Sequence, residues 1–174
     1  MKNIFAISGS LRKGSSNHTI LEYLGRKMPF NVNYLIYDGL STVPAFDPGL
    51  DNDTPPKPVS ELRSLLAEAD AIIICTPEYA HGIPGALKNA LDWMVSSGSF
   101  SGKPTALITA STGGKDAQEA MIKVLNAIDA ELRPQSTLLI PFVRTKIDAA
   151  GSISEEATIG RLNVLVKSIL AVIE

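Results

Sequence analysis

The sequence predicts an α/β protein whose parallel sheet is covered by helices on both faces. Five β-like runs alternate with five helix-like runs along the chain, which is the pattern of consecutive β-α units. The β-like runs are continuous stretches of Ile, Leu and Val, such as AIIIC at residues 71–75, and such runs are typical of strands buried on both faces. A chain of 174 residues can bury a sizeable core as one unit. We therefore expect one doubly wound domain that spans residues 1–174.

The amino-terminal third of the chain contains two strands, one helix and a long loop. NIFAIS at residues 3–8 is the first strand, and VNYLIY at residues 32–37 is the second. Between them, residues 17–28 have helical apolar spacing. The residues that share the apolar face of this helix are Ile20, Leu24 and Met28. Residues 38–57 are rich in prolines and acids and exceed an ordinary connection, so we expect either an ordered surface loop over the site or an interface, or a mobile segment.

The middle of the chain continues with a helix at residues 58–69, a strand at 71–76, a helix at 84–96 and a strand at 104–110. Pro84 suits the first position of its helix, because the N–H that it lacks would be unpaired there anyway. The apolar residues are Val59, Leu62, Leu66 and Ala69 in the first helix, and Ala86, Leu87, Ala90, Leu91, Trp93 and Met94 in the second. The second set covers most of its helix, which predicts contact with the sheet on one side and with another surface on the other.

The carboxy-terminal part adds a helix at residues 116–131, the fifth strand at 136–142 and a last helix at 154–173. The residues expected to face the core from these helices are Ala117, Met121, Val124, Ile128, Ile159, Leu162, Val166, Ile169 and Ile173. The single cysteine, Cys75, belongs to the third strand and is expected to be a buried strand residue rather than a reactive thiol.

Charge and hydropathy exclude several classes of function. The net charge of −2 gives no reason to expect binding to nucleic acid or to an anionic membrane. No run of 18 apolar residues is present, and the first residues do not have the pattern of a signal peptide. We therefore expect a cytoplasmic protein without nucleic-acid or membrane partners.

The loop after the first strand, SGSLRKGSSN at residues 8–17, has the features of a phosphate site. It leads directly into a helix, whose N-terminus favours an anion, and Arg12 can donate two N–H groups to phosphate oxygens. Other polar groups come from Ser10, Ser15, Ser16 and Asn17. A Walker A motif would need Lys where Ser15 stands, and G-x-G-x-x-G is absent, so one terminal phosphate fits best. The alternative is that Ser15 or Ser16 only caps the helix.

Two further loops follow the third and fourth strands. PEYAHGIPGALKNALDW at residues 77–93 resembles the signature PEYxxxxPGxLKNAxDW of the NAD(P)H-dependent FMN reductases, flavodoxin-like enzymes that include quinone, azo-dye and chromate reductases. GSLRKGSSN at residues 9–17 and STGG at residues 111–114 extend the resemblance over most of the chain. The resemblance implies the strand order 2-1-3-4-5, with the cofactor at the switch point between the first and third strands. It also implies a homodimer or homotetramer, and we expect the copies to pair partly through the wide apolar face of the 84–96 helix, which includes Ala86, Ala90 and Trp93.

The resemblance assigns these loops to parts of FMN. It implies that Ser10, Arg12, Ser15 and Asn17 hold the phosphate, with Ser16 where relatives often carry an aromatic residue. It places Pro77, Glu78, Tyr79 and Ala80 beside the ribityl chain and the ring, and Ser111, Thr112, Gly113 and Gly114 at the ring edge. Many relatives carry Asn where this chain has Ala80. Glu78 is expected to brace its loop rather than to catalyse, and the alternative for residues 111–114 is an ordinary β-to-α turn.

The function predicted in this way is reduction of FMN by NADH or NADPH, followed by transfer of two electrons to a quinone, a free flavin, an azo compound or a metal oxyanion. We expect no titratable side chain to be essential for hydride transfer, although His81 is a possible substrate contact and His18 a surface residue. No spacing of His, Cys and carboxylates suggests a metal, so none is expected. The alternatives are a flavodoxin-like one-electron carrier and a flavodoxin-fold binding protein without catalysis.

Overall fold

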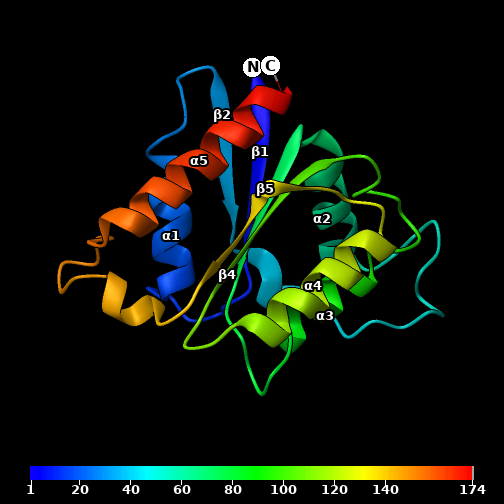
Figure 1. Cartoon of the computed structure of the whole chain (residues 1–174). Coiled ribbons are helices and arrows are strands. Elements are labelled where there is room, and N and C mark those ends of the chain that lie inside the picture. The colour runs from blue at the N-terminus through cyan, green and yellow to red at the C-terminus, as the bar shows by residue number, and fades with distance from the viewer. Residues whose placement is uncertain (174) are drawn as a thin grey trace.

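The computed structural model describes residues 1–173, which form a five-stranded parallel sheet with the order β2-β1-β3-β4-β5 (Figure 1). The strands are β1 (Lys2–Ser8), β2 (Val32–Tyr37), β3 (Ala71–Thr76), β4 (Pro104–Ala110) and β5 (Glu131–Ile140). Every neighbouring pair is parallel, and Ser8 at the end of β1 lies beside Cys75 near the end of β3. The predicted class and strand order are confirmed.

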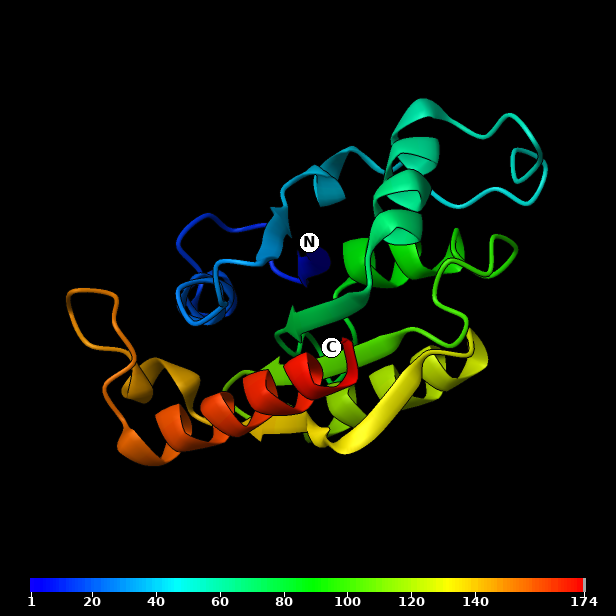
Figure 2. The same ribbon diagram turned by 90° about the horizontal axis from the view of Figure 1, so that it is seen from above.

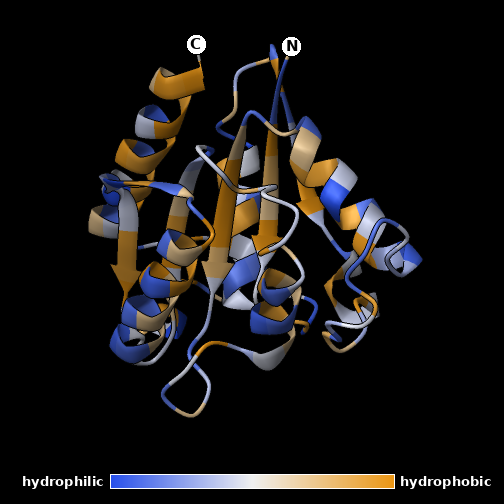
Figure 3. Ribbon diagram, turned by 90° about the vertical axis from the view of Figure 1, so that its right-hand side faces the viewer, coloured by the Kyte–Doolittle hydropathy of each residue, from blue (hydrophilic) through white to orange (hydrophobic). Residues whose placement is uncertain are grey.

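Helices cover both faces of the sheet, as the sequence predicts (Figure 2). The helices α1 (Ser16–Gly25) and α5 (Glu156–Ile173) pack on one face, and α2 (Lys57–Glu68), α3 (Gly85–Asp92) and α4 (Lys115–Ala127) pack on the other. The central strands β1, β3 and β4 are mostly apolar, whereas the edge strand β5 begins with polar residues and the helices alternate between apolar and polar residues (Figure 3). This difference follows from burial, because a strand in the middle of three layers has no exposed face. None of the helices described within residues 1–173 is both long and apolar enough to cross a membrane.

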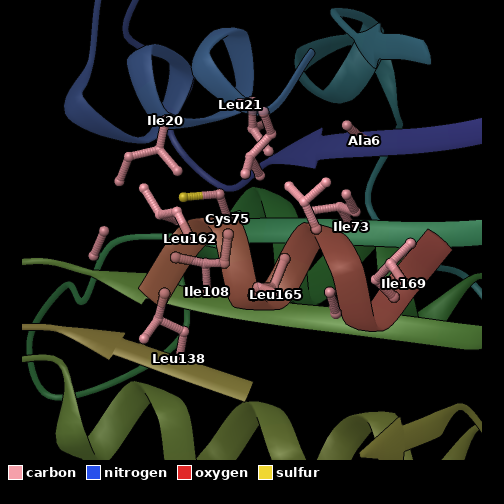
Figure 4. Close-up of a cluster of buried hydrophobic side chains, with 14 of the residues drawn as sticks. Ala6, Ile20, Leu21, Ile73, Cys75, Ile108, Leu138, Leu162, Leu165 and Ile169 are labelled. Carbon is pink, nitrogen blue, oxygen red and sulfur yellow. The ribbon is translucent and has the colours of Figure 1, made fainter. Parts of the chain in front are cut away.

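Cys75 shows how tightly the first core is packed. It lies between Leu21 of α1 and Leu162 of α5 in the cluster of buried side chains (Figure 4). Its thiol donates a hydrogen bond to Oδ1 of Asn17 at 3.3 Å, and complete burial raises its pKa well above the ordinary value. A thiol that is inaccessible and protonated is unreactive, so the prediction of a buried strand residue is confirmed.

Two helix boundaries differ from the predicted ones at the first and third helices. The helix α1 ends at Gly25 rather than at residue 28, so Met28 lies beyond its end and is only partly buried. The helix α3 spans only Gly85–Asp92, and Pro84 occupies the capping position before it rather than the first helical position. The residues after Asp92 form turns rather than a continued helix.

The boundary between α4 and β5 was also predicted wrongly. The helix ends at Ala127 rather than at residue 131, and Asp129 adopts the left-handed conformation with φ 59°. The strand β5 then begins at Glu131 rather than at residue 136 and contains Pro134, with a register shift opposite residues 105–107. Proline in a strand usually breaks the pattern, but an edge strand with an irregularity tolerates it.

The segment 38–57 is ordered and covers α3. It begins with a short 3-10 helix, η1 (Gly39–Thr42), and then crosses the indole of Trp93. Trp93 is 0% exposed, its Nε1 donates to the carbonyl of Pro44 at 2.9 Å, and its ring meets Phe46 edge-on at 5.0 Å. The second surface against the wide apolar face of α3 is therefore this segment. Because the side chain of Trp93 is already covered, this structure does not expose it for the contact between two copies that the sequence predicted.

A partly buried ion pair anchors the far end of the same segment. Oδ1 of Asp51 accepts hydrogen bonds from Arg63 of α2 at 2.7 Å and from Oγ of Ser96 at 2.8 Å. These two hydrogen bonds hold the pKa of Asp51 below its usual range. Arg63 also donates to the carbonyl oxygen of Trp93, so one guanidinium connects α2, the end of α3 and the segment.

We expect Asp51→Asn to lower the free energy of unfolding at neutral pH by about 1 kcal/mol, because Asn keeps an acceptor but loses the charge. The carboxylate contribution is complete above the unfolded-state pKa, near ~3.9, and is lost as the pH falls through the depressed folded-state pKa. Urea unfolding from pH 7 down to pH 3 should therefore show the two proteins converging in stability below pH ~4. Asp53→Asn, in the same segment but exposed, is the matched control. A stability difference that persists unchanged into acid would contradict the assignment.

Candidate functional site

A cavity lies at the carboxyl edge of the sheet, where the loops after β1, β3, β4 and β5 meet. Its lining consists of Ser10, Arg12, Ser15, Ser16, Asn17, Pro77, Glu78, Tyr79, Ala110, Ser111, Thr112, Val143 and Arg144. The structure thus brings together all the predicted cofactor-binding residues except Ala80, Gly113 and Gly114. This is the edge of an open α/β sheet at which ligands usually bind.

The loop after β1 is shaped by close packing and by helix capping. A Cβ on Gly9 would lie 2.5 Å from Oγ1 of Thr76, so only glycine lets the ends of β1 and β3 approach this closely. The hydroxyl of Ser15 caps α1 by accepting from the backbone N–H of His18 at 3.2 Å. Ser15 therefore has the structural role that was the alternative reading, and the amide of Asn17 is held by Cys75. Both residues shape the loop as well as lining the cavity.

Arg12 is the cation of this loop that lines the cavity. Its side chain is exposed and makes no hydrogen bond or ion pair with any residue from 1 to 173, whereas its backbone N–H is held by Oγ of Ser10 at 3.4 Å. A guanidinium without a partner at the rim of a polar cavity is available for a phosphate. The loop therefore fixes the position of Arg12 and leaves its charge free for a ligand.

The cavity contains a second guanidinium, that of Arg144, which was not predicted from the sequence. It belongs to the 3-10 helix η2 (Val143–Lys146) that follows β5. This helix is held against the loop after β4, because the N–H groups of Phe142 and Val143 donate to the carbonyls of Thr112 and Ser111, both at 3.1 Å. The sequence signal was available, since a charged run directly after the fifth strand must lie at the same edge of the sheet.

Glu78 braces the two loops on either side of the cavity. Its Oε2 accepts the backbone N–H of Ala117 in the first turn of α4 at 3.0 Å, and a Cβ on Gly113 would lie 3.2 Å from its Oε1. Gly114 has φ 103°, which favours glycine and allows the chain to enter α4. Neither glycine lines the cavity, so their absent side chains serve the turn and its contact with Glu78. The hydrogen bond to Ala117 is the contact that the predicted bracing role of Glu78 requires.

The tip of the loop after β3 is a tight turn with an unfavourable sequence. The N–H and carbonyl groups of Tyr79 and Gly82 exchange two hydrogen bonds, of 3.1 and 2.9 Å. Between them, Ala80 and His81 both have positive φ, 48° and 59°. Turns of this kind favour Asn and Gly, because a side chain with Cβ is strained in the left-handed region. The turn therefore stores strain beside the cavity.

We expect Ala80→Gly to stabilise the protein by about 0.5 kcal/mol, because relief of a strain of roughly 1–2 kcal/mol outweighs the entropy that glycine adds to the unfolded chain. Ala80→Val should destabilise the protein, since a β-branched residue tolerates positive φ least. Urea unfolding measures both. The matched control is Ala86→Gly in α3, where the same substitution should cost about 0.5–1 kcal/mol. Destabilisation by Ala80→Gly would show that the turn is not strained.

The chemistry of the lining fits FMN. Two guanidinium groups and the hydroxyls of Ser10 and Ser16 suit a phosphate, and the one carboxylate in the lining, Glu78, already has an oxygen bonded to Ala117. Pro77 and Tyr79 both line the cavity and Tyr79 is 54% exposed, so the lining includes apolar surface for an aromatic ring.

Known proteins resemble the chain over nearly its whole length. Residues 2–145 match the model of the NADPH-dependent FMN reductase family. A 2-hydroxy-1,4-benzoquinone reductase from Burkholderia is 32% identical over 161 residues, which cover 89% of this chain and 87% of the relative. A quinone reductase from Escherichia coli is 28% identical over 166 residues, 91% of this chain and 88% of the relative.

A solved structure extends the similarity to three dimensions. The flavoenzyme FerB from Paracoccus denitrificans, an NAD(P)H:(acceptor) oxidoreductase, superposes with a TM-score of 0.78 at 26% identity, over 99% of this chain and 97% of the other. The strand order, the chemistry of the cavity and the similar proteins therefore all indicate a flavin-dependent reductase. The chain belongs to the NADPH-dependent FMN reductase family, and it is an oxidoreductase that uses FMN and NAD(P)H.

Proposed function

We propose that the physiological acceptor is a small, flat two-electron acceptor of the quinone type. The observation that carries the proposal is the half-exposed Tyr79 in the lining of the cavity, whose ring is a surface on which a planar molecule can lie. Two of the relatives are named as reductases of quinones, which supports the same class.

We further propose that the chain contributes binding and orientation rather than acid–base chemistry to hydride transfer. FMN, when bound, supplies the hydride acceptor and the outlet for two electrons. Arg12 and Ser10 bind its phosphate, Pro77 and Tyr79 wall the cavity, and Glu78 holds the loops apart at a fixed spacing. Glu78 is the one carboxylate in the lining and is tied to Ala117, so it remains a brace.

The experiment is a two-step absorbance measurement on the FMN-loaded protein under argon. We expect NADPH or NADH to bleach the visible flavin band and a benzoquinone to restore it, with steady turnover when both are present. A pure one-electron carrier would not oxidise NAD(P)H steadily, and a binding protein without a cofactor would stay colourless with added FMN. If an azo dye or free flavin reoxidised the protein faster than any quinone, the proposed class of acceptor would be wrong, while the reductase activity would stand.

We also propose a cytoplasmic homodimer or homotetramer. The support is no longer Trp93 but the large apolar side chains that remain exposed near the cavity edge and after α3, namely Leu11, Tyr79, Val95 and Phe142. A single cysteine without a disulfide and a need for reduced pyridine nucleotide support the compartment. Light scattering at micromolar concentration tests the assembly, and a mass of 18.5 kDa would contradict it.

A further inference from the structure

Three potential metal ligands from the loop after β3 and the first turn of α4 lie close together. One ligand atom each from Glu78, His81 and Asp116 lies within 4.8 Å of the other two. Asp116 lies 35 residues after His81, so the spacing along the chain, from which no metal was expected, gives no sign of this cluster. We propose that the cluster binds a divalent first-row cation of the Zn²⁺ type.

The geometry needs only small movements of exposed side chains to accept such an ion. Nδ1 of His81 and Oδ2 of Asp116 are 2.7 Å apart, and their side chains are 84% and 54% exposed. Ligand atoms around a tetrahedral Zn²⁺ with bonds of about 2.0–2.2 Å are roughly 3.4 Å apart. The His81–Asp116 pair therefore opens slightly, and Glu78, whose ligand atom lies within 4.8 Å of both, is close enough to join it. The ion takes the place of the proton between imidazole and carboxylate.

The environment favours a cation at this point. Two carboxylates face one imidazole, and neither carboxylate forms an ion pair with a Lys or Arg among residues 1–173. Lys115, the adjacent cation, points to Glu119 at 3.9 Å. One nitrogen and two oxygen ligands suit Zn²⁺ or Co²⁺ better than Mg²⁺ or Ca²⁺, which prefer oxygen alone. Water completes the coordination.

Two backbone features orient the ligand side chains toward one another. Oε2 of Glu78 is bonded to the N–H of Ala117, which orients the carboxylate and leaves Oε1 for the ion. The left-handed turn at Ala80 and His81 folds the imidazole back toward Asp116. A bound ion would link the loop after β3 to the start of α4, next to the cavity. This inference does not depend on which acceptor the enzyme reduces.

The chain contains two histidines, which gives the test an internal control. His18 lies 3.4 Å from Glu22 on α1, a pair that offers two ligands instead of three. In a proton NMR titration of the FMN-loaded protein with Zn²⁺, we expect the imidazole signals of His81 to shift first and to saturate at one equivalent, while those of His18 stay in place. His18→Gln assigns the signals. With Co²⁺, visible absorption should report four- or five-coordinate metal.

Calorimetry on matched variants completes the test. We expect His81→Ala to abolish Zn²⁺ binding and Asp116→Asn to weaken it at least tenfold, whereas Glu119→Gln, one turn further along α4, should leave the affinity unchanged. Zn²⁺ should also raise the thermal midpoint of the wild type but not of His81→Ala. The proposal is overturned if both histidines respond at the same Zn²⁺ concentration, or if Asp116→Asn binds as tightly as the wild type; the cluster would then be a surface ion pair only.

Discussion

Arg12→Ala is expected to weaken FMN binding by about 1.5–3 kcal/mol, the contribution of a hydrogen bond to a charged group, and to leave riboflavin binding nearly unchanged. The reason is that the Arg12 guanidinium makes no ion pair or hydrogen bond with residues 1–173, so the free protein loses nothing when it is removed. The whole loss then appears in the complex with phosphate. In affinity this is a factor of about 10–150.

Flavin fluorescence titration of the apoprotein measures both ligands under the same conditions. Lys13→Ala is the matched control, because Lys13 is the adjacent exposed cation and does not line the cavity. It separates a direct contact from the general field of positive charge, which salt would screen. Arg144→Ala is expected to weaken FMN more than riboflavin as well, since its guanidinium shares the cavity. Equal losses for FMN and riboflavin with Arg12→Ala would contradict the phosphate assignment.

Much of this site was predictable because it follows from the order of strands and loops. Once β1, β3 and β4 are recognised as buried parallel strands, their carboxyl ends must meet at one edge, and the loops of Ser10, Pro77 and Ser111 come together. The polar residues in those loops then identify the cavity. Local sequence was sufficient here, because the strands are continuous apolar runs with clear ends.

The parts that were missed depend on contacts between distant segments. Arg144 lies just beyond the end of the predicted fifth strand, but its place at the cavity depends on the hydrogen bonds that hold η2 against the loop after β4. The His81–Asp116 contact depends on two consecutive residues in the left-handed conformation, and Ala and His seldom adopt this conformation. Apolar periodicity shows that a side chain such as Trp93 is buried, but not which segment covers it.

Trp93, which is covered by the segment 38–57, gives the largest expected effect on stability. Trp93→Ala should lower the free energy of unfolding by about 3–5 kcal/mol, the usual range for deletion of a buried Trp ring. Trp93 is fully buried, and its indole fills the space between α3 and the segment that contains Pro44 and Phe46. In this variant the carbonyl of Pro44 still accepts a hydrogen bond from Nδ2 of Asn89 at 2.8 Å. The loss of stability therefore comes mainly from the empty space left by the indole rather than from an unpaired acceptor.

Graded variants distinguish this packing role from an interface between subunits. Trp93→Phe should lower the free energy of unfolding by about 1–2 kcal/mol, because most of the volume and the contact with Phe46 remain. Phe46→Ala should lower it by about 0.5–1.5 kcal/mol, since Phe46 is 36% exposed and contributes mainly the edge-on contact. Urea unfolding followed by far-UV circular dichroism at one protein concentration suits all variants, because Trp93 is the only tryptophan and its fluorescence disappears with it. Light scattering on the folded fraction should give the wild-type mass for each. A Trp93→Ala protein that kept its unfolding free energy but fell to 18.5 kDa would instead make Trp93 an interface residue, and the segment 38–57 would then have to open in solution.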